Sequence, residues 1–187
     1  MVQRNEQVDV DADLVALAMD ELPYVTQAFQ ALAERYHSLL TGYCYNILRD
    51  HSEAEDTCQV ILLKVYQGLP NFEKRSSFKT WMMKIATNSC YSRLQKMKRE
   101  RERFVPLEQD VIENISDSGE SNTQALAGDR FGNMIESLSD LEQQLLSLRF
   151  IAELGLDEIA EILGMRLSAT KMRYYRALKK LDGHIDR

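Results

Sequence analysis

Apolar residues recur every three or four positions along most of the chain, which is the spacing of one face of an α-helix. The clearest run holds Phe29, Leu32, Ala33, Tyr36, Leu39, Leu40, Tyr43, Ile47 and Leu48. No stretch of six residues alternates apolar and polar side chains as a half-buried strand does, and the chain has only three prolines. The pattern predicts an all-α fold.

Helix-start and helix-stop residues divide the N-terminal half into long helices. The expected helices begin at Pro23, run from Ser52 to about Gly68, and cover 78–103. Pro23 is tolerated in a first helical turn, and Ser52 with Glu55 has the spacing of a capping box. Pro70 ends the second helix, and a short loop follows at 71–77.

The helical pattern stops over 104–123, where Pro, Gly, Ser, Asn and Asp accumulate. This composition is typical of a flexible acidic linker. Helices are expected again near 124–137, 139–152, 156–163 and 168–182. The sequence therefore predicts two small helical domains, 1–103 and 124–187, joined by a linker at 104–123.

The net charge of −6 taken alone argues against nucleic-acid binding, but the charges are segregated. Most of the 23 Lys and Arg lie in three stretches, 73–84, 93–103 and 171–180. The stretch 108–142 is acidic, with Arg130 as its single basic residue. Such segregation creates positive surfaces that attract phosphate on an otherwise acidic protein.

Other functional classes find little support. Cys44, Cys58 and Cys90 show no CxxC spacing and are interpreted as small buried side chains, and no metal site or cofactor is predicted. The sequence has no glycine-rich phosphate loop, HExxH or nucleophile-elbow motif, so we do not expect an enzyme. No apolar run reaches the ~18 residues of a membrane span, and the polar start lacks a secretory layout. We therefore expect a cytoplasmic protein without membrane insertion.

Residues 156–181, LDEIAEILGMRLSATKMRYYRALKKL, have the layout of a helix-turn-helix. Ala160 is small where the second helix must cross, Gly164 suits a left-handed turn, and Ser168 is a candidate cap for the second helix. The non-core positions of that helix include Lys171, Arg173, Tyr175, Arg176 and Lys179. Such side chains suit phosphates and base edges in the major groove. The alternative is an ordinary helical hairpin with a solvated basic face. Thr170 departs from the aliphatic residue common in such motifs.

A second stretch, 71–99, interleaves aromatic and basic residues. The aromatic residues are Phe72, Phe78, Trp81 and Tyr91, and the basic ones are Lys74, Arg75, Lys79, Lys84 and Arg93. Aromatic rings with cationic neighbours suit single-stranded DNA. Trp81, Lys84 and Asn88 share roughly one helix face, from which an amide can read a base edge. Equally, the aromatic rings can be core residues that the charges merely flank.

Here the chain resembles a known family. AEDTCQVILLKVYQGLPNF with SSFKTWMMKIATNSCYSRL is similar to the second region of extracytoplasmic-function (ECF) sigma factors, and LEQQLLSLRFIAELGLDEIAEILGMRLSATKMRYYRALKKL to their fourth region. RFIAEL followed by LSATKMRYYRAL is similar to the SigX-like branch. The resemblance covers about 25–103 and 137–182. It implies a non-enzymatic subunit that binds core RNA polymerase, directs it to promoters and assists promoter melting.

The resemblance also implies residue roles. Single-stranded minus-ten DNA would contact Phe72, Lys74, Arg75, Ser76, Lys84 and Asn88. Duplex minus-thirty-five DNA would contact Ser168, Lys171, Met172, Arg173, Tyr175 and Arg176. Asp56 and Gln59 would contact the clamp helices of the largest polymerase subunit. An apolar surface around Leu145, Leu148 and Phe150 is a candidate contact for the flap of the second-largest subunit. The sequence is compatible with an anti-sigma factor as a further partner.

Three departures from the family pattern leave the class intact and bear on the promoter sequence and the clamp contacts. Val60 follows the matching glutamine where many members have an acid, Ser92 replaces a common Asp, and Ala169–Thr170 replaces a common Thr–Val. Two other classes stay open. A stand-alone helix-turn-helix regulator would be expected to dimerise on two half-sites, and a helical adaptor would bind protein only.

Overall fold

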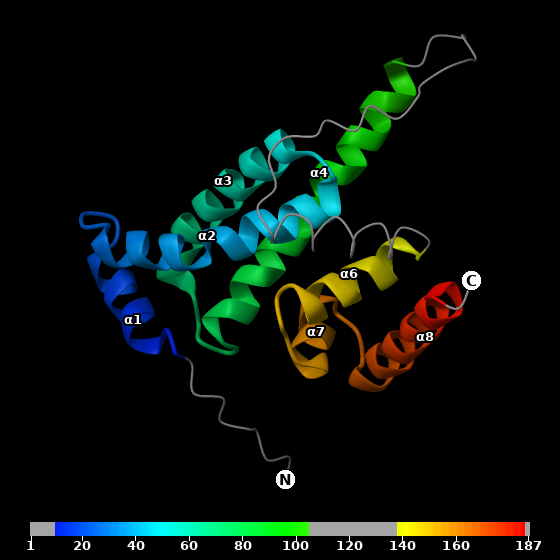
Figure 1. Ribbon diagram of the computed structural model, residues 1–187. Coiled ribbons are helices and arrows are strands. Elements are labelled where there is room, and N and C mark those ends of the chain that lie inside the picture. Colours follow the sequence, from blue (N-terminus) through cyan, green and yellow to red (C-terminus); the bar gives the residue numbers. More distant parts are fainter. Residues whose placement is uncertain (1–9, 105–137, 186–187) are drawn as a thin grey trace.

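The computed structural model describes residues 10–104 and 138–185, and within these ranges the regular structure is helical (Figure 1). The N-terminal group of helices comprises α1 (Ala12–Glu21), α2 (Gln27–Leu48), α3 (His51–Gly68), the 3₁₀ turn η1 (Leu69–Asn71) and α4 (Phe78–Phe104). The C-terminal group comprises α6 (Asp140–Phe150), α7 (Leu156–Ile162) and α8 (Leu167–Ile185). The all-α prediction is confirmed.

The N-terminal group packs around α2, which contacts α1, α3 and α4. Its apolar stripe is buried as the periodicity predicts, and Leu32, Leu40 and Tyr43 are among the most deeply buried side chains. The phenol of Tyr43 lies 3.0 Å from the hydroxyl of Thr87 on α4, so the one polar atom of this large ring has a partner inside the core.

The start of the chain differs from the prediction. Pro23 lies in a turn and not in a helix, and α2 begins four residues later, at Gln27. A short helix that the sequence reading missed, α1, packs on α2 through Val15 and Ala18. Buried Asp11, just before α1, hydrogen-bonds to Tyr36 and Arg35 of α2. These long-range contacts fix α1, whose ten residues are too few for stability as an isolated helix.

The long helices α3 and α4 lie where expected, with one correction at a cap. The N-cap of α3 is Asp50, whose carboxylate accepts from the backbone N–H of Glu53 at 2.9 Å. The predicted cap, Ser52, lies inside the first turn. Asp50 is the better acceptor there, since a carboxylate at a helix start also favours the helix dipole.

The C-terminal group follows the predicted pattern closely. Ser139 precedes α6, and the carboxylate of Glu142 accepts from the backbone N–H of Ser139 at 3.0 Å, as in a capping box. The predicted helix at 124–137 and nearly all of the predicted linker at 104–123 lie outside the described residues.

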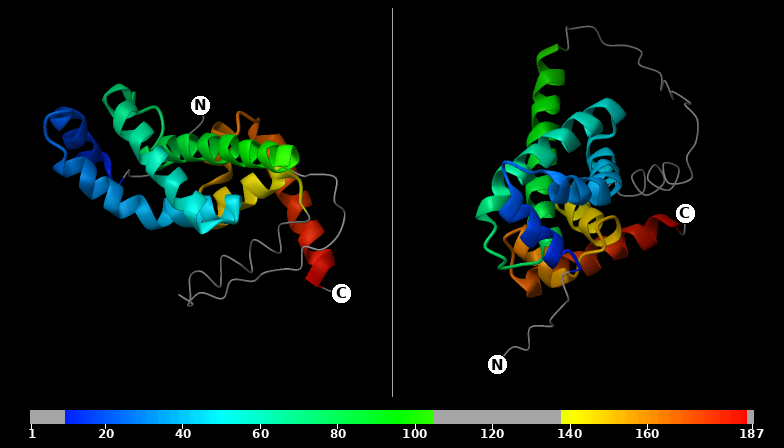
Figure 2. Two further views of the ribbon diagram at one scale, coloured as in Figure 1. Left: turned by 90° about the horizontal axis from the view of Figure 1, so that it is seen from above. Right: turned by 90° about the vertical axis from the view of Figure 1, so that its left-hand side faces the viewer.

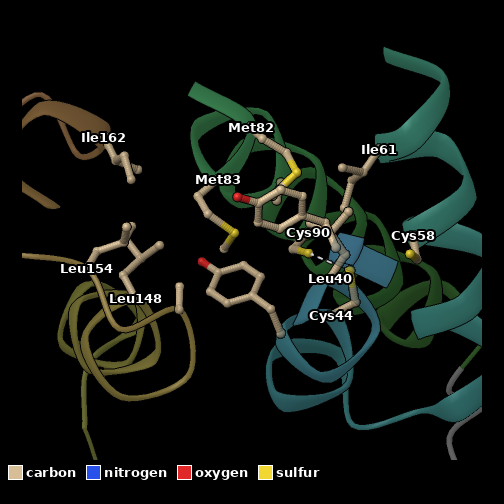
Figure 3. Packing of buried hydrophobic residues seen from close by; sticks show 14 of the residues in the cluster. Leu40, Cys44, Cys58, Ile61, Met82, Met83, Cys90, Leu148, Leu154 and Ile162 are labelled. Atoms are coloured by element: carbon tan, nitrogen blue, oxygen red, sulfur yellow. Dashed lines mark hydrogen bonds between the residues drawn. The ribbon is translucent and has the colours of Figure 1, made fainter. Parts of the chain in front are cut away.

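The two groups of helices pack against each other. α7 contacts α4 and α6 contacts α2, and both views in Figure 2 place α7 beside the beginning of α4. The buried apolar residues form one continuous cluster that includes Met83 of α4 together with Leu148, Leu154 and Ile162 (Figure 3). The recognition surfaces described next therefore lie on a single packed body.

Candidate nucleic-acid interface

The helix-turn-helix predicted from the sequence is formed by α7 and α8. Gly164 lies in the turn with φ +63°, a left-handed conformation that favours glycine. The backbone N–H of Met165 donates to the carbonyl of Ala160 at 2.8 Å, which closes the end of α7. Ile159 and Ala160 are buried beneath the turn. The local geometry is that of the motif.

Burial divides α8 into two opposite faces. Thr170, Ala177 and Leu181 are buried, and Tyr174 is half-buried on the same side. The exposed face holds Ser168, Lys171, Met172, Tyr175, Arg176 and Lys179. Met172 is 53% and Tyr175 63% exposed, unusual for large apolar side chains on a helix with a well-defined core face. An exposed face that mixes cations with large apolar groups suits phosphate contacts beside base-edge contacts.

Two details of α8 correct the sequence reading. The helix begins at Leu167, so Ser168 lies within the first turn and not at the cap. Arg173 is half-buried at the flank of the exposed face. The unusual Thr170 is accommodated because its hydroxyl donates to the carbonyl of Arg166 at 3.2 Å, which satisfies a polar group that is otherwise fully buried.

An ion pair holds α8 to α6. Lys180 Nζ lies 2.7 and 2.8 Å from the two carboxylate oxygens of Glu142, whose side chain is 8% exposed. Burial alone would raise the pKa of Glu142, but hydrogen bonds from Lys180 and Ser139 outweigh it and lower the pKa below its usual value. The pair therefore stabilises the packing that presents the exposed face of α8.

Replacing Lys180 by methionine is expected to destabilise the protein by about 1–2 kcal/mol near neutral pH, because it leaves a buried carboxylate without its cation. The lowered pKa of Glu142 contributes stability above its unfolded-state value of about 4.3, and that stability is lost as the pH falls through the folded-state pKa. Urea unfolding at pH 7 and pH 3 measures the loss of stability near neutral pH and how much of it disappears in acid. The matched control is Lys179→Met, which removes an exposed neighbour. A deficit for K180M that is the same at both pH values would contradict the assignment.

The aromatic residues of the N-terminal stretch are mainly core. Phe78 and Phe72 are buried, with Phe72 5.0 Å from Trp81 between ring centroids and 6.3 Å from Phe78. Trp81 is half-buried, and a methyl group at Gly68 would come within 3.1 Å of its ring. The sequence left open whether these rings stack on bases or belong to the core, and the structure places Phe72 and Phe78 in the core. Phe72 anchors the predicted minus-ten loop but offers no open ring face.

The polar residues of that loop and of α4 are accessible. Lys74 and Arg75 are exposed, and Lys74 adopts φ +54°, while Arg75 pairs with Glu73 at 2.6 Å. Ser76 is half-buried. On α4, the side chains of Lys84 and Asn88 are exposed one turn apart. The structure therefore brings the predicted minus-ten residues to one end of α4 and the adjoining loop, with Phe72 beneath them.

The basic stretch 93–103 is less positive than its composition indicates. Arg93 makes two 2.5 Å hydrogen bonds to the carboxylate of Glu53, and its pKa rises because of them while that of Glu53 falls. Lys96 pairs with Glu100 at 3.8 Å, and Lys98 with Asp140 at 3.6 Å. These pairs offset part of the charge of the stretch, while the exposed Arg99, Arg101 and Arg103 add to the positive surface formed by α8 and the loop before α4.

The predicted polymerase-contact residues, Asp56 and Gln59, are exposed on α3. Beside them on the same helix face lie Val60, 47% exposed, and Leu63, 55% exposed. Val60 is the departure from the family's clamp-contact pattern noted above, whereas Leu63 was not singled out from the sequence. A groove of about 350 Å³ lies between α3 and α4, lined by Glu53, Asp56, Thr57, Val60, Lys64, Ser89, Arg93 and Lys96. An amphipathic exposed face of this kind suits a protein partner more than DNA.

The predicted flap surface needs correction. Leu145 and Leu148 are fully buried, and only Phe150 remains exposed. Both leucines fall in the continuous core because α6 packs between α2 and α8, a contact that helix periodicity alone does not reveal. A flap contact can therefore involve Phe150 but not the two leucines.

Cys44, Cys58 and Cys90 are buried, as predicted, and Cys44 lies 3.3 Å from Cys90 between sulfur atoms. Among residues 10–104 and 138–185, no cluster of metal-ligating side chains is found. Within the same part of the chain, no helix is both long and apolar enough to cross a membrane.

Comparisons with known proteins agree with this geometry. Residues 32–100 match the family described as Sigma-70 region 2, and residues 128–181 match Sigma-70, region 4. The ECF RNA polymerase sigma factor SigW of Bacillus subtilis is 27% identical over 82% of this chain and 87% of its own length. SigX of the same organism is 25% identical over 86% of this chain and 84% of its own length. The RNA polymerase sigma-H factor of Pseudomonas aeruginosa is 25% identical over 83% of this chain and 85% of its own length.

Solved structures share the fold. CnrH in complex with the cytosolic domain of CnrY matches 94% of this chain and 97% of that chain, with a TM-score of 0.69 at 20% identity. The sigma factor RpoE of Bartonella quintana, in complex with the anti-sigma factor NepR, matches over 87% of this chain and 98% of that chain, with a TM-score of 0.65 at 24% identity.

Proposed function

Because the chain belongs to the ECF group of the sigma-70 family, whose members direct RNA polymerase to promoters, we propose a division of labour among its exposed surfaces. The exposed face of α8 reads duplex DNA at the minus-thirty-five element. The loop before α4, with Lys84 and Asn88, holds melted minus-ten DNA. The observation that carries the proposal is the two-faced burial of α8, which leaves cations and large apolar side chains exposed together.

The energetics indicate that polymerase must contribute. Polar contacts to one captured base give about 1–3 kcal/mol, and extruding a base from a duplex costs a few kcal/mol. One captured base therefore roughly offsets its own extrusion and cannot open a bubble. The net charge of −6 also opposes DNA binding by the free chain. We propose that Asp56, Gln59 and their apolar neighbours on α3 bind the clamp of the polymerase, so that DNA is read in the assembled enzyme.

In vitro transcription with core RNA polymerase, with and without this protein, tests the proposal. Specific transcripts from a promoter library that require the protein are the expected result. If a control sigma factor works but this folded protein neither yields transcripts nor binds core polymerase, the proposal is wrong. Sedimentation as a dimer on two half-sites would then favour the stand-alone regulator.

Replacing Asn88 by alanine is expected to lower transcription from a cognate promoter by about 5- to 150-fold, since loss of one polar base contact costs about 1–3 kcal/mol. The control is Gln95→Ala, an exposed amide two turns further along the same side of α4. Promoter titrations with a pre-melted minus-ten segment identify the step. Equal losses for N88A and Q95A would argue against base capture by Asn88.

Further proposals rest on the family alone. RFIAEL and LSATKMRYYRAL favour the SigX-like branch, which relatives at 25–27% identity do not separate from other branches. We propose that the chain has no catalytic activity of its own, acts where RNA polymerase acts, in the cytoplasm, and is a candidate partner for an anti-sigma factor.

A further inference from the structure

Helix α1 is attached to α2 at both of its ends. At its start, the carboxylate of Asp11 accepts hydrogen bonds from the phenol of Tyr36 and from the guanidinium of Arg35. At its end, Glu21 Oε2 accepts from the backbone N–H of Ala28, in the first turn of α2, at 3.1 Å. The two attachments hold α1 at a fixed place on α2, where it also contacts η1.

The carboxylate of Asp11 binds α2 although the residue stands at the N-cap of α1. An aspartate at an N-cap ordinarily accepts from a backbone N–H of its own helix, but the side chain of Asp11 makes no such bond. It is buried, and a buried carboxylate is costly unless it is paired and hydrogen-bonded. Its partners lie 24 and 25 residues further along the chain. The carboxylate therefore links α1 to α2 instead of capping α1.

Tyr36 extends this link to the loop before α4, residues 73–77. Its ring centroid lies 5.7 Å from that of Phe78, the first residue of α4, and Phe78 lies 6.3 Å from Phe72. Phe72 directly precedes the loop and Phe78 directly follows it, and all three rings are buried. Figure 1 shows α1 at the same end of the N-terminal group as this loop. Both ends of the loop are thus anchored in one aromatic cluster that Asp11 holds through Tyr36.

We propose that Asp11 is a positioning residue for minus-ten recognition, which acts through Tyr36 and Phe78 on the loop before α4. The inference rests on the proposed function and adds to it α1, which precedes the residues 32–100 that match region 2. Protein interiors are close-packed, so a displaced Tyr36 ring displaces Phe78 and with it the loop. A recognition surface loses affinity when the side chains beneath it are loosely held.

The effect of Asp11 should be confined to melted DNA. The main contacts of α1 are with α2 and η1. Core polymerase is proposed to bind Asp56 and Gln59 on α3, and duplex DNA the exposed face of α8. Loss of the Asp11 carboxylate should therefore weaken capture of the minus-ten strand while polymerase binding and the minus-thirty-five footprint stay close to those of wild type.

Sequence discrimination by the protein assembled with core polymerase tests the proposal. The probe is a fluorescent single-stranded oligonucleotide with the non-template minus-ten sequence of the strongest promoter from the library, and the reference is a scrambled version. Asp11→Ala is expected to lower the ratio of the two affinities by about fivefold, the lower end of the cost of one lost base contact. A smaller folded fraction reduces the amount of complex but not this ratio. The ratio therefore separates positioning from lost stability.

Two variants serve as controls. Asp13→Ala removes an exposed acid from the first turn of the same helix and should leave the ratio unchanged. Arg35→Met removes one partner of the Asp11 carboxylate but keeps the bond to Tyr36. It should lower stability, because a buried carboxylate loses its cation, and leave the ratio within about twofold of wild type. If R35M loses as much discrimination as D11A, loosening of α1 alone explains the effect and the proposal is overturned.

The route through Tyr36 is tested by Tyr36→Phe, which keeps the ring in the core and removes the hydroxyl that binds Asp11. We expect Y36F to lose about fivefold in the ratio and D11A/Y36F to lose no more, whereas independent effects would multiply to about 25-fold. A multiplied loss overturns the proposal, as does a ratio for D11A within twofold of wild type. If D11A does not fold, Y36F decides by the same twofold criterion.

Failure of the proposed function gives a different result. In that case the wild-type protein with core polymerase does not distinguish the minus-ten oligonucleotide from the scrambled one. Discrimination by wild type that D11A and Y36F both retain leaves the proposed function standing and removes only the role of Asp11.

Discussion

Reversing the charges of Lys171 and Arg176 together is expected to lower promoter-specific transcription by at least about 100-fold. The two side chains lie at opposite edges of the exposed face of α8. Neither makes an ion pair within the described part of the chain. A lost base contact costs about 1–3 kcal/mol, and a lost phosphate contact weakens binding to all sequences. The two glutamates would also repel phosphate. Transcription titrations and footprints of the minus-thirty-five element measure the effect.

The control for this double variant is Arg101→Glu with Arg103→Glu, which makes the same change in net charge on exposed residues of α4. If the loss came only from overall charge, both double variants would fail equally. Salt dependence adds a second readout: the slope of log affinity against log salt should fall by about 2 for K171E/R176E. An unchanged slope would show that α8 does not contact the phosphate backbone.

The helices and the recognition face of α8 could be predicted because they depend on local periodicity. A side chain three or four residues from its neighbour shares its helix face wherever that helix packs. The left-handed conformation of Gly164 could also be predicted, because the short turn between the two packed helices requires it. The prediction failed by one or two residues at the caps of α3 and α8 and by four residues at the start of α2, and it missed α1.

The contacts between distant segments could not be predicted from the sequence. The hydroxyl of Thr80 donates a hydrogen bond to Glu158, which lies 78 residues further along the chain. Neither residue belongs to a sequence motif that predicts this contact. Leu145 and Leu148 form an apolar stripe that is equally consistent with a core or with a docking surface, and only packing against the N-terminal group shows them to be core. Phe72 was ambiguous in the same way, because spacing does not distinguish a buried ring from one that stacks on bases.

This ambiguity leads to a prediction about the aromatic cluster. Replacing Phe78 by alanine is expected to cost about 3–5 kcal/mol of unfolding free energy, a large part of the 5–15 kcal/mol typical of a domain. Phe78 is 1% exposed, and its ring centroid lies 5.7 Å from that of Tyr36 and 6.0 Å from that of Trp81. Its loss leaves a cavity beneath the loop that presents Lys74 and Arg75.

The single tryptophan of the chain makes this measurable, since Trp81 belongs to the cluster and its fluorescence reports local packing. Urea unfolding followed at Trp81 gives the stability of F78A. The control is Leu63→Ala on the exposed face of α3, expected to change stability by less than about 0.5 kcal/mol. A cost for F78A below 1 kcal/mol would mean that these rings do not pack as a core. Phe72 and Trp81 would then be free to stack on DNA bases, and the minus-ten surface would have to be redrawn around them.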